Sequence, residues 1–156
     1  MQARLVKRDR SYMIGISVTI PSAKRNQIKL NKSVMKRLVS LQRYLTLPGT
    51  EEIIAFPSNK KGLDGDEWII GYSVFSRFPP FKDYELHELP GGTYFVGAQN
   101  VELESVYGMM KSHWIMTEMY KPLPVLFECY TISGDHKDVQ VYWKVKPQSG
   151  TEQKYA

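Results

Sequence analysis

The chain has 156 residues, 42% of them hydrophobic and 24% charged, with a formal net charge of +5. This composition is typical of one ordinary globular domain that needs no disulfides or metals to build a core. The single cysteine, Cys129, excludes an internal disulfide framework and favours a reducing compartment. No apolar run approaches the roughly 20 residues that span a bilayer, and the basic N-terminus lacks the apolar run of a secretory signal. We therefore expect a cytoplasmic location without a membrane partner.

The positive charge is concentrated in the first part of the chain. Residues 1–43 hold eleven Lys or Arg against one acid, whereas the remainder holds ten against fifteen. Such a block suits an acidic protein or a nucleic acid, although a solvated helix face has the same pattern. The candidate contact residues are the seven basic side chains of residues 24–43: Lys24, Arg25, Lys29, Lys32, Lys36, Arg37 and Arg43.

In the first half of the chain, residues 1–10 are basic and polar and are expected to be a flexible N-terminus. Residues 12–20 predict a strand that Pro21 ends. A helix is expected over residues 24–43, with Asn31 as a candidate N-cap and one strongly basic face. Its apolar stripe recurs at helical spacing and consists of Val34, Leu38, Leu41 and Leu45. Residues 51–56 and 68–75 predict two further strands.

The second half of the chain repeats this order. Residues 84–89 and 93–99 predict strands, and a helix is expected from about residue 100 to residue 119. Pro122 and Pro124 are expected to separate this helix from a strand ending at Tyr130. A turn at residues 134–137 leads to a last strand over residues 139–145, and residues 148–156 are expected to be a flexible tail.

The element order therefore predicts a duplication within one α+β domain over residues 11–147. Two β-α-β-β units, at about residues 11–78 and 84–146, would form one curved antiparallel sheet with two helices on one side. A short echo supports the repeat, since residues 12–15 (YMIG) are similar to residues 94–97 (YFVG). The place where the two halves meet is a natural position for a central ligand cleft.

Glu128 is the residue that does not fit a purely structural strand. It lies within the apolar run of residues 122–130, and alternation places Leu126, Glu128 and Tyr130 on one face and Phe127 and Cys129 on the other. A buried carboxylate costs several kcal/mol to desolvate unless a partner compensates it. Two interpretations remain open: a rim glutamate satisfied by a nearby lysine or backbone N–H, or a carboxylate kept among aromatic rings for a cationic ligand.

Other chemistry has little support in the sequence. His87, His113 and His136 fall in three different elements without ligand spacing, so no metal is expected. No phosphate-binding glycine loop, nucleophile elbow or oxidoreductase fingerprint occurs, and no cofactor is expected. The chain is instead rich in aromatic residues, with ten Tyr, six Phe and three Trp. Four of its seven methionines are in residues 109–119, which suits a surface that adapts to several ligand shapes.

Over residues 11–147 the chain resembles the GyrI-like small-molecule-binding domain. The resemblance rests on the duplicated element order, on residues 84–97 (YELHELPGGTYFVG), on a helix bearing Trp114 and on the Phe-Glu-x-Tyr core at residues 127–130. That domain is found alone and as the effector-binding domain of bacterial multidrug-sensing transcription regulators. The resemblance implies a curved sheet, two helices and a central cleft lined by aromatic side chains.

The resemblance also implies a set of ligand-binding residues. Glu128 matches the family's strand glutamate, which faces bound lipophilic cations. The wall of the cleft would consist of Trp114, Tyr72 and Tyr107, with Tyr12, Phe75 and Met110 as further members. The chain begins without the DNA-binding region of the regulators, so a stand-alone receptor is expected.

Three hypotheses for function follow. The first is a stand-alone binding protein for cationic or amphipathic lipophilic compounds, with Glu128 as the central charge. The second is an interaction or inhibitor protein that applies the basic face of residues 24–43 to gyrase, DNA or another acidic partner. The third is a hydrolase of small electrophiles in which Glu128 activates water, although no second catalytic group is evident.

Overall fold

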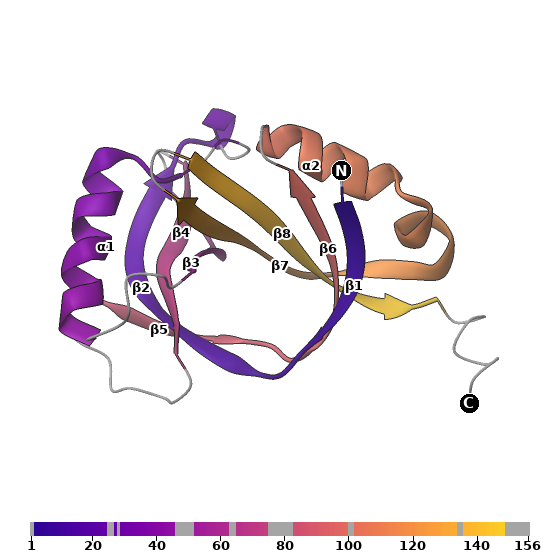
Figure 1. The fold of residues 1–156 in the computed structure, drawn as a ribbon, viewed down its shortest axis with the longest axis horizontal. Coiled ribbons are helices and arrows are strands. Elements are labelled where there is room, and N and C mark those ends of the chain that lie inside the picture. The colour runs from indigo at the N-terminus through magenta and orange to yellow at the C-terminus, as the bar shows by residue number, and fades with distance from the viewer. Residues whose placement is uncertain are drawn as a thin grey trace.

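Eight antiparallel strands form one curved sheet, and two helices cover one of its faces (Figure 1). The computed structural model describes residues 2–24, 27, 29–45, 52–62, 65–74, 83–99, 102–133 and 136–148. The helices are α1 (Lys32–Leu45) and α2 (Leu103–Ser112), with a short 3-10 helix, η1 (Ser22–Lys24), and a π-helical turn, η2 (Ile115–Met119). The strands are β1 (Gln2–Arg8), β2 (Ser11–Ile20), β3 (Ile53–Gly62), β4 (Gly65–Val74), β5 (Glu85–Leu89), β6 (Gly92–Gln99), β7 (Tyr120–Ser133) and β8 (His136–Pro147).

The sheet has the internal symmetry that the duplicated sequence predicts. Its strand order is β1-β6-β8-β7-β3-β4-β2-β5, so β2-α1-β3-β4 and β6-α2-β7-β8 are matching halves. The halves join where β3 pairs with β7, with Ala55 opposite Glu128 and Ile53 opposite Tyr130. The α+β fold class with two β-α-β-β units on one antiparallel sheet is thereby confirmed. Glu128 lies at the junction of the halves.

The two outermost strands are exchanged between the halves. β1 precedes the first unit but pairs along its length with β6 of the second. β5 lies within the second unit as predicted from residue 84, but the matching half begins at β6, and β5 pairs with β2 of the first half. The expected flexible N-terminus is therefore wrong for residues 2–8. Its arginines have structural contacts, because the Arg8 guanidinium lies 5.2 Å from the ring centres of both Phe127 and Tyr142. Charged side chains on such an edge strand also disfavour pairing with another chain.

Both helices pack on the same face of the sheet. Their buried residues belong to one hydrophobic cluster: Val34, Leu38 and Leu41 from α1 and Leu103, Val106 and Met110 from α2. The predicted N-cap is confirmed, since Asn31 Oδ1 accepts a hydrogen bond of 2.9 Å from the Val34 N–H. The helix begins at Lys32, so the expected helical span of residues 24–43 is wrong at its start. Residues 22–24 form η1, and Lys29 turns into the protein.

The second helical region also differs from its expected bounds. The α-helix ends at Ser112 and η2 follows, while residue 100, its expected start, lies outside the described residues. Pro122 and Pro124 lie inside β7, which begins at Tyr120; they coincide with a register shift between Pro122 and Leu126, where ladder N–H groups are not required. Among the described residues no helix has the length and apolarity to cross a membrane.

Candidate functional site

Glu128 lies in the middle of the helix-covered face and is completely buried, with 0% of its surface exposed. Its strand neighbours are Ala55 on β3 and Val141 on β8, two small or medium apolar residues. The predicted alternation along β7 is confirmed. Tyr130 belongs to the cluster beneath the helices, and Phe127 and Cys129 belong to a second cluster on the opposite face.

The carboxylate accepts hydrogen bonds from three side chains. The Tyr130 hydroxyl donates to Oε1 and the Tyr107 hydroxyl donates to Oε2, each at 2.6 Å. The Lys29 ammonium donates to both oxygens, at 3.0 and 3.2 Å. These four bonds use about four lone-pair positions, which is the full accepting capacity of an ionised carboxylate. We call Glu128, Tyr107, Tyr130 and Trp68 the carboxylate cage.

Trp68 completes the cage from β4. The Lys29 ammonium lies 4.1 Å from the centre of the indole ring, which is a close cation–π contact. The Lys29 side chain is 1% exposed and also donates to the Gln27 carbonyl at 3.3 Å. A buried alkylammonium thus lies between a carboxylate and an aromatic face. In the described part of the chain, Glu128 and Lys29 are the two buried charged residues.

Burial sets the electrostatics of the cage. Loss of hydration raises the pKa of Glu128 above its ordinary value, and the Lys29 charge and the two tyrosine hydroxyls oppose this rise. The same loss of hydration lowers the pKa of Lys29, and the attraction of Glu128 opposes it. Burial and the adjacent carboxylate raise the pKa of both Tyr107 and Tyr130, so these hydroxyls remain protonated donors. Because every contact to the carboxylate is a donor, the geometry fits an ionised Glu128 paired with an ammonium.

The structure therefore gives Glu128 a fixed lysine partner. A nearby lysine is the partner that the first of the two interpretations from the sequence expects for Glu128. The pair, however, lies at the centre of the fold and not at its rim. The expectation of an unpaired carboxylate facing an open cleft is wrong in this structure, because Lys29 fills the position next to it. A cation is nevertheless what the cage holds.

The other predicted site residues lie at varying positions. Tyr107 contacts Glu128 directly. Tyr72 is buried, and its hydroxyl donates to the Leu38 carbonyl at 3.1 Å. Met110 is on the buried side of α2. Tyr12 is half-buried at the start of β2, where the Arg10 guanidinium lies 6.0 Å from its ring centre.

Trp114 does not join the cage, and Phe75 cannot be placed relative to it. Trp114 is 53% exposed and stacks on the His113 ring at 5.9 Å, so it lies apart from the cage in this structure. The reason is that α2 ends before Trp114 and the chain leaves the helical stripe there. Phe75 lies outside the described residues.

Sequence reasoning missed Lys29, Trp68 and the role of Tyr130 as a donor. Lys29 was grouped with the exposed basic residues because its neighbourhood is rich in lysine and arginine. One signal could have separated it, since it stands between two apolar residues, Ile28 and Leu30. Trp68 was predicted in a strand, and its side chain shares the helix-covered face with Tyr72 because the two are four positions apart.

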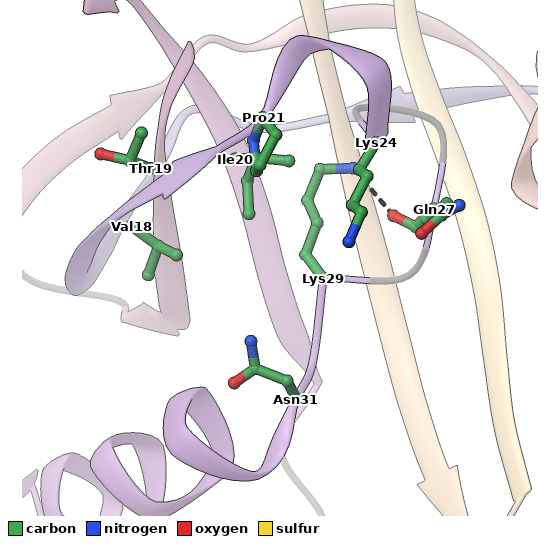
Figure 2. Close-up of a pocket in the computed structure, with 8 residues that line it drawn as sticks. All are labelled: Val18, Thr19, Ile20, Pro21, Lys24, Gln27, Lys29 and Asn31. Carbon is green, nitrogen blue, oxygen red and sulfur yellow. Dashed lines mark hydrogen bonds between the residues drawn. The ribbon is translucent and has the colours of Figure 1, made fainter. Parts of the chain in front are cut away.

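A cavity of about 310 Å³ lies beside Lys29 (Figure 2). Ile20 at the end of β2 and Pro21 after it line one side, and Lys24 and Gln27 line the other. Lys29 itself contributes to the lining. Lys29 therefore contacts both the carboxylate cage and this cavity.

The remaining basic candidates are on the surface. Lys24, Lys32, Lys36, Arg37 and Arg43 are exposed, Arg25 lies outside the described residues, and Lys29 is buried and unavailable to a partner surface. Within the part of the chain that the structure describes, no group of three His, Cys, Asp or Glu side chains could hold a metal ion.

No family model and no curated protein sequence matches this chain. Solved structures do match in fold. The C-terminal domain of EcmrR superposes with a TM-score of 0.60 at 12% identity, covering 93% of this chain and 97% of that domain. SAV2435, solved bound to tetraphenylphosphonium, superposes with a TM-score of 0.59 at 18% identity, covering 99% and 98% of the two chains.

A third similar structure is EcmrR in complex with DNA, with a TM-score of 0.62 and 13% identity. There the match covers 93% of this chain but spans 57% of the EcmrR chain. The fold is that of the GyrI-like effector-binding domains, to which EcmrR's C-terminal domain and SAV2435 belong. At these identities the likeness establishes the fold.

Proposed function

We propose that this protein binds small lipophilic cations, and that the ligand's positive charge is held by Glu128 in the carboxylate cage. The observation that carries the proposal is that the cage already stabilises a cation. The Lys29 ammonium lies 3.0 Å from Glu128 Oε1 and 4.1 Å from the Trp68 ring centre. A carboxylate, an aromatic face and two fixed hydroxyls are the groups that recognise cationic ligands.

The chemistry of the cage favours a cation with a large apolar body. Coulomb attraction is stronger in this dry interior than in water, and the Trp68 face adds a cation–π contact of about 0.5–2 kcal/mol. The surroundings of the cage are apolar, because the helix-covered face is one continuous hydrophobic cluster. The fold likeness to SAV2435, solved with tetraphenylphosphonium, supports the same ligand class.

The geometry gives less support to the other two hypotheses. A hydrolase would need Glu128 to accept a proton from water, but Lys29, Tyr107 and Tyr130 occupy its accepting positions. Of the basic residues of α1, Arg37 lines a described cavity, which it shares with the acidic Asp83, and the basic residues fit a solvated helix face equally well. Cation binding is the function that uses the buried charge.

The test is a calorimetric titration of the protein with tetraphenylphosphonium, in parallel with the Glu128→Gln variant. We expect saturable binding by the wild-type protein and at least about tenfold weaker binding by Glu128→Gln, because the amide keeps the shape but removes the charge. Quenching of the buried Trp68 should follow the same titration curve, since this ring faces the bound charge.

Glu118→Gln is the matched control, because Glu118 is an exposed carboxylate on η2. It should bind as the wild type does. Equal affinity in Glu128→Gln and the wild type would show that the central carboxylate does not hold the ligand, and an absence of binding in all three proteins would refute the proposed function.

A further inference from the structure

We infer that Lys29 is a tethered competitor that sets the specificity of this site: a ligand binds at Glu128 only if it carries a positive charge and enough apolar surface to displace the Lys29 ammonium. The inference rests on the proposed function and adds the selection rule of the same site. It follows from three features of the structure: the contacts of Lys29, its attachment to the chain and the space beside it.

The contacts of Lys29 make the competition strong. The ammonium bonds both carboxylate oxygens, the Gln27 carbonyl and the face of Trp68. The Lys29 backbone also hydrogen-bonds the Tyr130 hydroxyl, which opposes the rise in the pKa of Tyr130. Because Lys29 belongs to the chain, it competes at an effective concentration on the order of millimolar or above. Small hydrated cations have no comparable advantage and are excluded.

Charge is the first requirement for displacement. If Lys29 leaves and nothing replaces it, Glu128 becomes a buried, uncompensated carboxylate, which is strongly unfavourable. A neutral ligand cannot remove this penalty. The ligand must therefore bring a positive charge, and its apolar body must replace the contacts of the lysine stem with the hydrophobic cluster.

The Lys29 side chain can move without breaking the sheet. Of the segment between β2 and α1, the described residues 21–24, 27 and 29–31 form no ladder pairs. The Lys29 backbone contacts the Tyr130 hydroxyl, so the backbone can stay in place while the side chain rotates away from Glu128. The cavity of about 310 Å³ next to Lys29 gives the side chain a place to go (Figure 2). A water molecule takes about 30 Å³ of liquid, so this space is several waters in size.

The experiment compares wild type and Lys29→Met by calorimetric titration with tetraphenylphosphonium and with tetraethylammonium, a cation with much less apolar surface. Methionine keeps an apolar stem without the charge. We expect Lys29→Met to bind tetraphenylphosphonium about tenfold or more tightly than the wild type, and to bind tetraethylammonium, which the wild type excludes. Lys32→Met, at an exposed position at the start of α1, should leave both affinities unchanged.

A second measurement needs no variant. Amine acetylation followed by mass spectrometry should leave Lys29 unmodified in the free protein and modify it when tetraphenylphosphonium is saturating. The inference would be overturned, and the proposed function left standing, if wild type and Lys29→Met bind tetraphenylphosphonium with the same affinity and Lys29 stays protected from acetylation in the saturated protein. If Lys29→Met binds tetraphenylphosphonium and the wild type does not, the role of Lys29 as a competitor is supported and the proposed function of the wild-type protein is contradicted. An absence of binding in both proteins would overturn both proposals.

Discussion

Replacing Lys29 with methionine is expected to lower the free energy of unfolding at neutral pH by about 3–5 kcal/mol, the usual cost of removing one partner of a buried ion pair. The reason is that Glu128, which is 0% exposed, would lose the charge that compensates it. The measurement is urea unfolding followed by circular dichroism. The same variant in saturating tetraphenylphosphonium should recover stability, because the bound cation replaces the missing charge.

The loss should depend on pH in a defined direction. Burial raises the pKa of Glu128 above 4.5, and in Lys29→Met the opposing lysine charge is gone. A carboxyl with a raised folded-state pKa contributes stability that is present at low pH and lost as the pH rises through that pKa. The deficit of Lys29→Met relative to wild type should therefore shrink as the pH falls from neutrality toward 4.5.

The double variant Lys29→Met with Glu128→Gln is the control for this prediction. It removes both charges together, and the glutamine oxygen still accepts from a tyrosine hydroxyl while its amide group can donate to the other. We expect it to recover most of the stability that Lys29→Met loses. A deficit as large as in the single variant would show that packing of the lysine stem, and not the stranded charge, stabilises the fold.

Replacing Gly71 with alanine is the second change with a large expected effect. Gly71 on β4 lies opposite Gly15 on β2, and a Cβ at Gly71 would fall 1.9 Å from the Ile14 carbonyl oxygen and 2.4 Å from the Gly15 Cα. Both atoms belong to backbone within the ladder, so they cannot move aside as a side chain would. We expect a loss of about 3 kcal/mol or more, at or above the top of the range for overpacked cores.

Gly108→Ala is the matched control in urea unfolding. Gly108 lies within α2, and a Cβ built there meets nothing within 4 Å. Alanine at an exposed helical position should stabilise the protein by about 0.5–1 kcal/mol. The opposite signs at two glycines distinguish steric conflict at Gly71 from a general effect of replacing glycine. A stable, fully folded Gly71→Ala protein would contradict the close approach of β2 and β4.

Local patterns in the sequence were sufficient for the arrangement of the elements. Alternation in β7 correctly separates Glu128 and Tyr130 from Phe127 and Cys129, because side-chain direction in a strand depends only on position. The helical stripe of Val34, Leu38 and Leu41 and the cap at Asn31 are equally local signals, and the structure confirms them. These features need no information from elsewhere in the chain.

Long-range partners were beyond the reach of the same reasoning. Lys29 and Glu128 are 99 positions apart, and no local pattern in either segment indicates that the two side chains are in contact. Basic neighbours made Lys29 look like a surface residue, although Leu30 beside it is buried as well. The exchange of β1 and β5 between the halves is also a tertiary feature. The repeat itself carried a signal, since a strand at residues 84–89 precedes the strand at residues 93–99, and residues 94–97 match residues 12–15. A matching strand before residue 12 is therefore implied.

The central claim is that the carboxylate cage exists to hold a cation and that Lys29 occupies it in the absence of ligand. A crystal structure of the wild-type protein with tetraphenylphosphonium tests this most directly. We predict the phosphonium between Glu128 and the Trp68 ring, with the Lys29 ammonium moved away from the carboxylate. The cation bound elsewhere, with Lys29 still on both oxygens of Glu128, would contradict the account.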